Sequence, residues 1–454
     1  MHCGYITKLK DLREHPNADR LMLGTCFINT VCVAKDKYAE GEIGVYFPVD
    51  LQLSMEFCEK NGLLAVYENG INVSGGYMDP AKRNVKAIKL RGEKSDGLFL
   101  PLACLEYTGV NMDTLNVGDQ ITVVNGHEIC RKYIPKVKAP KTHSNGKKQV
   151  SKVKHQEVPT FFEHKDTEQL AYNLDAFKPG DHVEITLKMH GTSQRTGYHK
   201  VHVGYKKTLW DRILRRAGTP VYDWGMTSGT RRTVLKDFEG GFYGSNAFRE
   251  PHAKRFEGKL FKGETVYYEV VGFTDTGAPI MATCSNKKLN DKEFIKQYGD
   301  ETIFSYGCVP TVSIDCDDLQ SEIYVYRMTM TNEDGDTVEY TPDYMRYRCE
   351  MMGVECVPVF WSGFIPENPG SKDDPTITAG EWIKNKAEMF YDGADPVGKT
   401  HVREGVVVRI LNRPTFAAYK HKNFAFKVLE GIIKDTADAP DMEEADGLDQ
   451  EVVE

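Results

Sequence analysis

The chain has 454 residues, of which 40% are hydrophobic and 27% are charged, as is typical of a globular protein of two or three domains. It contains no apolar run as long as a membrane span, no signal-peptide pattern at its start, and eleven scattered cysteines without a CxxC pair. These features argue against a membrane protein, a disulfide framework and a zinc site. We therefore expect a cytoplasmic protein in a reducing compartment, without a membrane partner and favoured to be a monomer.

Charge is distributed unevenly along the chain. The net charge is −8, but residues 435–454 carry nine acids and no base, so removing them leaves +1 on residues 1–434. Residues 131–156 hold nine Lys or Arg and no acid, a composition that suits a polyanion and is equally typical of a solvated linker. The acidic tail lacks apolar periodicity, and we expect it to be disordered.

The predicted elements divide the chain into parts. Residues 1 to about 130 contain short strand-like runs, such as 44–48 and 85–90, separated by Gly, Asp and Asn turns, and this predicts a small all-β barrel. The basic stretch 131–156 is interpreted as a linker. Residues 157–434 mix strands and helices, with helices expected near 208–217 and 379–390. The predicted fold class is therefore α+β, with a disordered tail at 435–454.

Lys188 is the most informative residue of the second part. An alternating apolar run at 183–187 predicts a strand that ends at this lysine, and His190 and Gly191 follow at once. A lysine held at a strand end beside a glycine is well placed to act as a nucleophile. Considered alone, the segment is better interpreted as an exposed lysine before a turn. The nucleophile becomes the favoured interpretation only when four further segments are counted.

Two of those segments contain a carboxylate in an apolar run, one contains arginines after hydroxyl residues, and one contains a pair of lysines. With Lys188 the five segments are 188–191 (KMHG), 228–232 (SGTRR), 266–272 (VYYEVVG), 403–409 (REGVVVR) and 420–423 (KHKN). Their order resembles that of the covalent nucleotidyltransferases, the ligases and capping enzymes that pass through a lysyl–nucleotide intermediate. DNA ligases and capping enzymes usually carry aspartate at the position of His190. RNA ligases of the T4 RNA ligase 2 type resemble this chain in carrying histidine there. The stretch 323–336 also resembles that group.

The first unit carries a second resemblance. Residues 15–21 (HPNADRL) and 91–101 (RGEKSDGLFLP) resemble the OB-fold tRNA-binding domains appended to aminoacyl-tRNA synthetases. An OB-like unit ahead of a ligase domain is similar to the RNA ligase described from Deinococcus. The resemblances together imply an OB-like β-barrel at 1–130 followed by an adenylyltransferase domain of ATP-grasp-like antiparallel sheets with helices. OB barrels bind single-stranded nucleic acid; a barrel that only packs against the next domain is an equal alternative.

The resemblance implies an ATP-dependent RNA ligase that uses ATP, Mg²⁺ or Mn²⁺ and RNA, possibly within a DNA or RNA duplex. Lys188 is the implied nucleophile, Glu404 the implied metal ligand, and Lys420 and Lys422 are implied to stabilise charge on the α-phosphate. The reaction needs an unprotonated amine, and nearby cations favour that form. The residues that the resemblance assigns to cofactor binding are His190, Gly191, Arg231, Arg232, Glu269 and Tyr326.

Several of these residues have a structural alternative. Glu269 would accept a hydrogen bond from a ribose hydroxyl, but a buried ion pair would also explain a carboxylate in an apolar strand. Tyr326 would stack on adenine, and a core position suits it nearly as well. Arg231 or Arg232 would engage a phosphate, and the sequence leaves open which of the two points inward.

Three alternative functions remain open: a DNA ligase, a capping guanylyltransferase, and a non-catalytic RNA-binding protein on a ligase-like fold. His190 argues against the first two, and the retained Lys188, Glu269 and Glu404 argue against the third. Two segments have no place in the expected chemistry. Residues 393–400 (GADPVGKT) match the P-loop pattern, but no strand is expected before them and no helix after them, so we interpret them as a connection. Residues 273–322 have no predicted function.

Overall fold

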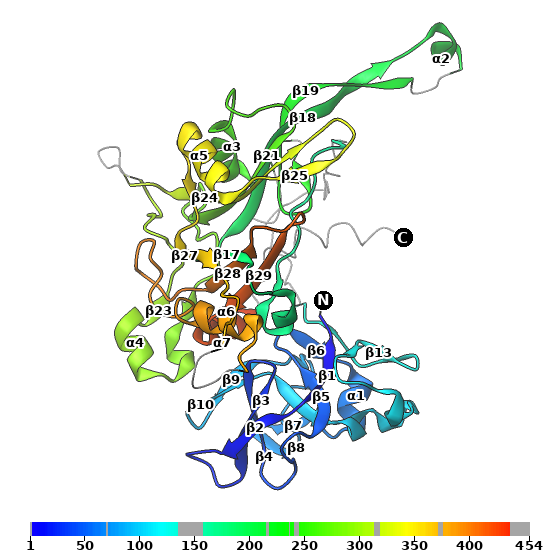
Figure 1. Cartoon of the computed structure of the whole chain (residues 1–454), viewed down its shortest axis with the longest axis vertical. Coiled ribbons are helices and arrows are strands. Elements are labelled where there is room, and N and C mark those ends of the chain that lie inside the picture. Colours follow the sequence, from blue (N-terminus) through cyan, green and yellow to red (C-terminus); the bar gives the residue numbers. More distant parts are fainter. Residues whose placement is uncertain are drawn as a thin grey trace. The chain divides into compact units, whose positions relative to one another are not determined.

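The computed structural model describes residues 2–69, 71–134, 158–214, 218–235, 237–239, 245–312, 318–370 and 376–435 (Figure 1). They fall into two units: residues 2–134 with 424–435, and residues 158–423. Nearly all of the predicted linker and tail lies outside the described residues, and the domain assignments made from sequence stay predictions. No helix in the described ranges combines the length and the apolar character needed to cross a membrane.

The first unit is rich in short antiparallel strands, as predicted. Its main sheet has the order β11-β5-β1-β12 and its second sheet the order β2-β3-β4. The described strands form no closed barrel. The bounds are β1 Gly4–Lys8, β2 Lys10–Glu14, β3 Leu21–Cys26, β4 Asn29–Ala34, β5 Ile43–Phe47, β6 Leu51–Leu53, α1 Met55–Lys60, β7 Ala65–Glu68, β8 Ile71–Gly75, β9 Ala87–Leu90, β10 Glu93–Asp96, β11 Leu98–Pro101, β12 Gln120–Ile121, β13 Val123–Val124, β14 His127–Glu128 and β15 Cys130–Lys132.

Helix α7 (Phe424–Asp435) packs in the first unit although it follows the last strand of the second. Lys427 Nζ lies 2.5 Å from Asp96 Oδ2, and the Lys94 ammonium lies 5.3 Å from the centre of the Phe424 ring. Both partners come from β10, so the helix is held by charge as well as by its apolar face.

The second unit contains a five-stranded sheet in the order β16-β29-β28-β17-β27. Side chains alternate between its faces because the period of a strand is two residues. On one face Val183 and Ile185 of β17, and Val406 and Val408 of β28, form a core with α6. The opposite face carries polar and charged residues and faces the other sheet. The bounds are β16 Glu168–Gln169, β17 His182–Leu187, β27 Val359–Phe364, α6 Ala379–Glu388, β28 Gly405–Ile410 and β29 Ala417–Lys422.

The other large sheet has the order β20-β19-β18-β21-β24-β25, and β26 pairs with β24. Strand β21 is buried along its whole length. The outer parts of β18 and β19 extend as an arm that carries α2 at its tip (Figure 1). The bounds are β18 Thr192–Lys206, α2 Leu209–Ile213, β19 Thr219–Gly229, β20 Val234–Leu235, α3 Glu250–Lys254, β21 Glu264–Gly272, β22 Cys284–Ser285, α4 Lys292–Tyr298, β23 Glu301–Thr302, β24 Ser321–Thr331, β25 Thr337–Glu339, α5 Pro342–Met352 and β26 Glu355–Cys356.

The predicted α+β class is confirmed, and both helices expected in the second part are present as α2 and α6. Helix α6 begins with a capping box, in which the Thr378 hydroxyl accepts the Glu381 N–H and the Glu381 carboxylate accepts the Thr378 N–H. Helix α2 is shorter than the predicted 208–217, and residues 215–217 lie outside the described part of the chain. The barrel predicted for the first unit is not confirmed.

Candidate functional site

A pocket of about 1040 Å³, measured out to its open mouth, lies between the two large sheets of the second unit. Strands β17, β28 and β29 supply one wall, β18, β21 and β24 supply the facing wall, and α5 closes one side. The lining residues are His164, Thr167, Glu184, Thr186, Leu187, Lys188, Met189, Ser193, Arg231, Glu269, Tyr326, Met345, Arg346, Cys356, Val357, Val359, Val407, Arg409, Phe416, Ala418 and Lys420.

The register of the five-stranded sheet brings the predicted lysines to one end of this pocket. Val407 pairs with Thr186 on one side and with Lys420 on the other. The Lys188 N–H donates to the Gly405 carbonyl at 3.0 Å, and Gly405 pairs with Lys422. Lys188 therefore leaves β17 next to the end of β28 that carries the fourth predicted motif, with the lysines of β29 beyond it.

Glu404 joins two of these lysines. Its Oε1 atom lies 2.8 Å from Lys188 Nζ and 3.4 Å from Lys422 Nζ, and its side chain is 1% exposed. A buried carboxylate with two ammonium partners is an ion-pair network in a low dielectric, where charges attract strongly. The carboxylate predicted as a metal ligand thus lies in direct contact with the predicted nucleophile.

The second oxygen of Glu404 has no hydrogen-bond partner within the described ranges. This Oε2 atom is buried and lies 3.7 Å from His190 Nδ1. A buried carboxylate oxygen without a donor is unfavourable unless a cation approaches it. No cluster of three His, Cys, Asp or Glu among the described residues could hold a metal by itself. A Mg²⁺ or Mn²⁺ ion would fit here only if substrate and water supplied most ligands, which is how Mg²⁺ is usually bound.

The facing wall carries Glu269 and Tyr326. Glu269 lies on β21 with 7% of its surface exposed. In the sheet register it lies opposite Ser193 of the neighbouring strand β18. The Tyr326 hydroxyl lies 2.9 Å from Ser193 Oγ, which fixes the tyrosine ring against the wall. Both predicted cofactor contacts therefore line the pocket opposite the lysines.

Of the two adjacent arginines, Arg231 points inward. It lines the pocket and forms an ion pair with Asp166, whereas Arg232 is exposed and is not among the lining residues. The Arg195 side chain of β18 also donates to the Arg231 carbonyl at 2.6 Å, and this hydrogen bond anchors the turn that carries Arg231 to the sheet. The choice that the sequence left open is thereby made by the fold.

His190 and Gly191 lie behind the pocket rather than on its surface. The His190 N–H donates to the Tyr306 hydroxyl at 2.6 Å. A Cβ added to Gly191 would lie 2.4 Å from the Val270 carbonyl oxygen, so only glycine allows this close approach to β21. Gly191 therefore has a packing role, and its predicted contact with the cofactor stays a prediction.

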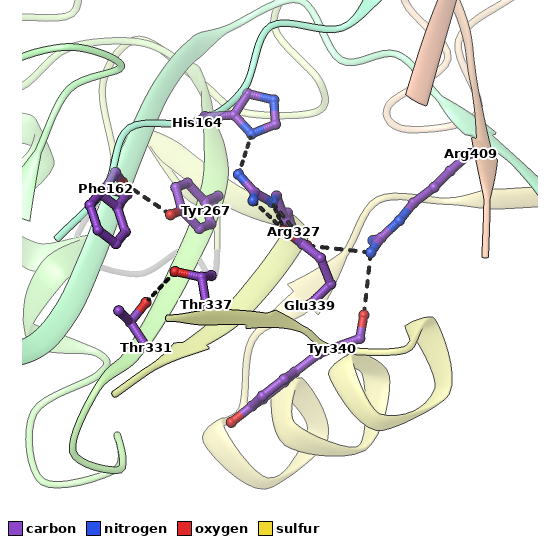
Figure 2. Close-up of polar contacts among 9 residues, drawn as sticks. All are labelled: Phe162, His164, Tyr267, Arg327, Thr331, Thr337, Glu339, Tyr340 and Arg409. Carbon is purple, nitrogen blue, oxygen red and sulfur yellow. Dashed lines mark hydrogen bonds and ion pairs between the residues drawn. The ribbon is translucent and has the colours of Figure 1, made fainter. Parts of the chain in front are cut away.

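A group of residues to which the sequence analysis assigned no role lies at the pocket (Figure 2). Arg327 is paired with Glu339 and donates to His164 Nδ1 at 3.4 Å, and Arg409 Nη2 lies 3.5 Å from Glu339 Oε2. The guanidinium groups of Arg327 and Arg409 lie 4.6 and 4.9 Å from the centre of the Phe416 ring. Two arginines thus share one carboxylate, which leaves a positive charge beside the pocket.

His164 enters this group as a neutral side chain. Burial, together with the neighbouring Arg327 and Arg231, holds the pKa of His164 well below its ordinary value. Because arginine can only donate, Nδ1 accepts its hydrogen bond and the ring proton is assigned to Nε2. His164 also lies edge-on to Tyr326, with ring centres 5.0 Å apart. The sequence offered no signal for it, since it lies in a segment without a motif.

The pocket lining carries more cations than acids, and several of these cations are paired with carboxylates. Its lining residues include five cations and two acids, Glu184 and Glu269. The cations are Lys188, Arg231, Arg346, Arg409 and Lys420. Combined with the aliphatic and aromatic lining, this charge is complementary to a molecule that has a flat ring at one end and several phosphates at the other.

No protein-family model and no curated protein sequence matches the chain. Solved structures of an RNA ligase from Naegleria gruberi do match in fold. A variant with ATP and Mn is 15% identical, with a TM-score of 0.53 over 94% of this chain and 98% of that chain. A variant with AMP and Mn has the same identity and coverages and a TM-score of 0.54. The enzyme with PPi is 14% identical, with a TM-score of 0.53. The chain therefore has an RNA ligase fold along nearly its whole length.

Proposed function

We propose that this protein is an ATP-dependent RNA ligase that works through a lysyl–AMP intermediate. The observation that carries the proposal is the contact of Lys188 with Glu404 at 2.8 Å, at the end of a cationic pocket to which Lys420 also contributes. A lysine among cations and a buried carboxylate is the arrangement expected for a nucleophile that attacks a phosphate. The RNA ligase fold supports the same reading.

ATP is the proposed cofactor. Its base would enter between Tyr326 and the aliphatic residues of β28, its ribose would be held by Glu269, and its phosphates would be bound by Arg231 and Lys420. The solved RNA ligase structures contain ATP, AMP or PPi, which supports a nucleotide in this pocket.

A divalent metal ion, Mg²⁺ or Mn²⁺, would be held by Glu404 together with phosphate oxygens and water. When bound, the ion neutralises charge on the phosphates and so lowers the barrier to attack. The Mn in the solved RNA ligase structures supports this assignment, as does the Oε2 atom of Glu404, which has no hydrogen-bond partner among the described residues.

The proposed reaction has three steps. The Lys188 amine, after losing its proton, attacks the α-phosphorus of ATP; an N–P bond forms, and the P–O bond to pyrophosphate breaks. An oxygen of the RNA 5′-phosphate then attacks the phosphorus bound to lysine, the N–P bond breaks as the Lys188 amine takes up a proton, and the AMP moves to the RNA end. Finally a 3′-hydroxyl attacks the activated 5′-phosphate, the strand is sealed and AMP leaves. Lys420 and Lys422 stabilise the negative charge that develops in each transfer.

The first unit is proposed to bind RNA as an OB-like domain, and the whole chain to be an intracellular enzyme of RNA repair close to the T4 RNA ligase 2 type. Support comes from the two segments that resemble OB-fold tRNA-binding domains and from the coverage of 98% of the solved RNA ligase chain. The basic stretch at 131–156 would contribute to the same electrostatic attraction.

The test is covalent labelling with ATP carrying a radioactive α-phosphate, in Mg²⁺ or Mn²⁺, followed by denaturation. The protein should be labelled, Lys188→Ala should not, and Lys200→Ala should be labelled normally because Lys200 is paired with Glu333 on the surface. A mass increase of one AMP in the purified protein would explain weak labelling by prior occupancy. Labelling from GTP alone would instead indicate a capping guanylyltransferase. If the protein is not labelled and its mass is unmodified, the alternative of a non-catalytic RNA-binding protein would be favoured.

The second arm of the test supplies a labelled protein with RNA and, separately, DNA carrying a 5′-phosphate. Release of the label with RNA sealing confirms the ligase and its substrate. Sealing of DNA in preference to RNA would contradict the proposed substrate while leaving the lysyl–AMP chemistry intact.

A further inference from the structure

Residues 273–322 had no predicted function, and the loop 304–307 within them reaches the candidate site. Phe304 is 2% exposed and Tyr306 is 4% exposed, so both rings are buried. They lie between two segments that are far apart in the sequence: one begins with Lys188, and the other leads to Glu404.

The first segment is held at His190. Its backbone N–H donates to the Tyr306 hydroxyl at 2.6 Å, and its ring lies edge-on to Phe304 with centres 4.5 Å apart. Burial raises the pKa of Tyr306 well above its ordinary value, so the phenol stays neutral. His190 is two residues after Lys188, and a hydrogen bond to its backbone limits where the lysine can lie.

The second segment is held at His401. Its ring meets Tyr306 at 4.5 Å and Phe304 at 5.2 Å between centres, both edge-on, and Ser305 Oγ lies 3.1 Å from Thr400 Oγ1. A Cβ added to Gly398 would lie 2.3 Å from the Gly307 nitrogen. The two backbones therefore touch, and the glycine of the P-loop-like pattern is required for this contact rather than for binding phosphate.

The backbone of the loop indicates that this position is imposed. Tyr306 has φ of 52°, in the left-handed region that bulky residues rarely adopt. Such a conformation persists only where the surrounding structure determines it, and it is often found next to functional sites. Here the surrounding structure is the pair of segments that Tyr306 contacts.

We propose that Phe304 and Tyr306 form a wedge that positions Lys188 against Glu404. The wedge fixes His190 after the nucleophile and His401 before the carboxylate, and so sets the 2.8 Å contact between Lys188 Nζ and Glu404 Oε1. Neither residue lines the pocket, so both are positioning residues that act through their neighbours. The inference rests on the proposed lysine adenylylation and assigns a role to a segment that the reaction itself does not explain.

Tyr306→Phe tests the wedge because it removes the hydroxyl and keeps the ring. Single-turnover adenylylation should slow by about ten- to a hundred-fold, the range expected for a small misplacement of reacting groups, with the half-saturating ATP concentration unchanged. The matched control is Tyr298→Phe, which removes a hydroxyl from the same segment; that hydroxyl accepts a hydrogen bond from the Gln297 side chain at 3.0 Å. It should adenylylate at the normal rate.

The outcomes separate the possibilities. An unchanged rate in Tyr306→Phe, with a labelled wild type, overturns the wedge and leaves the proposed function intact. A slower rate that comes with weaker ATP binding and a lower melting temperature shows a merely structural role and also overturns it. Phe304→Leu, which keeps apolar bulk at the other ring, should give the same loss of rate at constant ATP affinity if Tyr306→Phe does not fold. An unlabelled, unmodified wild type removes the proposed function and the wedge together.

Discussion

At the scale of single residues, Asp395 shows how burial sets a charge. Its side chain is 0% exposed, its Oδ1 atom accepts the Val397 N–H at 2.8 Å, and its Oδ2 atom has no hydrogen-bond partner among the described residues. Burial raises the pKa of Asp395 to about 7, with the Val397 N–H and the nearby Arg403 opposing the rise. The folded protein therefore holds this proton at pH values where an unfolded chain releases it.

Stability should consequently fall as the pH rises from about 4 to about 7. Because the folded pKa lies above the unfolded one, the folded state binds more protons in this window, and the slope is at most about 1.4 kcal/mol per pH unit. Above pH 7 the contribution should be constant. Urea unfolding of the second unit between pH 5 and pH 8 measures this. Asp395→Asn should flatten the dependence; an unaltered slope in the variant would assign it to another group.

Glu264 is a second buried carboxylate, but it is fully paired. It is 0% exposed, its oxygens accept from Arg348 at 2.9 and 2.8 Å, and it accepts the Tyr340 hydroxyl at 3.1 Å. The ion pair between Glu264 and Arg348 joins the start of β21 to α5. Its partner Arg348 is also buried, so neither charge can be solvated if the other is removed.

Glu264→Gln should therefore destabilise the second unit by about 3–5 kcal/mol, the usual cost of leaving one partner of a buried pair unpaired. The control Glu333→Gln removes an exposed partner of Lys200 and should change stability by less than about 1 kcal/mol. Denaturant unfolding of both variants gives the comparison. Equal effects would mean that the Glu264–Arg348 pair contributes no more than a surface pair.

At the scale of elements, the candidate site depends on how closely strands approach one another. Gly191 lies where the chain turns from β17 to β18, and an added Cβ would meet the Val270 carbonyl oxygen at 2.4 Å and Glu269 Cγ at 2.9 Å. The carboxylate of Glu269 and the amine of Lys188 belong to facing walls, so this turn sets the width of the pocket.

Gly191→Ala should move the two walls apart and reduce both stability and adenylylation, since the clash is with backbone and cannot be relieved by a side-chain rotation. A loss of about 1–3 kcal/mol is expected for such overpacking. Gly431→Ala is the control, because an added Cβ there has no atom within 4 Å and α7 accommodates alanine well. Normal labelling by Gly191→Ala would show that the pocket tolerates a wider separation.

At the scale of the whole molecule, helix α7 belongs to the first unit. Phe426 is 1% exposed and Leu429 is 0% exposed, and the backbone contacts of α7 group it with that unit. Shortening both to alanine should destabilise the first unit by several kcal/mol, at about 2–5 kcal/mol for each large apolar side chain. Hydrogen exchange should then accelerate in β9 and remain slow in β28, which lies in the other unit. Faster exchange in both would show that the units unfold together.

Local pattern was sufficient for much of this protein. The alternation at 183–187 predicted β17 and placed Lys188 at its end, because strand periodicity is a property of adjacent residues. Helix α6 was predicted because its apolar spacing is also local. The barrel was predicted from the short strand-like runs and turns of residues 1–130, but whether short strands close on themselves depends on pairing between distant strands, which local pattern does not specify.

Local pattern along the chain therefore specified the set of elements and the chemistry of the residues at their ends. Which of those residues meet depended on how the sheets pair and pack. Arg231 rather than Arg232 lines the pocket, His164 and Phe416 join it from segments about 250 residues apart, and Tyr306 lies between His190 and His401. Such contacts depend on sheet register and on the packing of one sheet against another, and a single sequence carries no local signal for either.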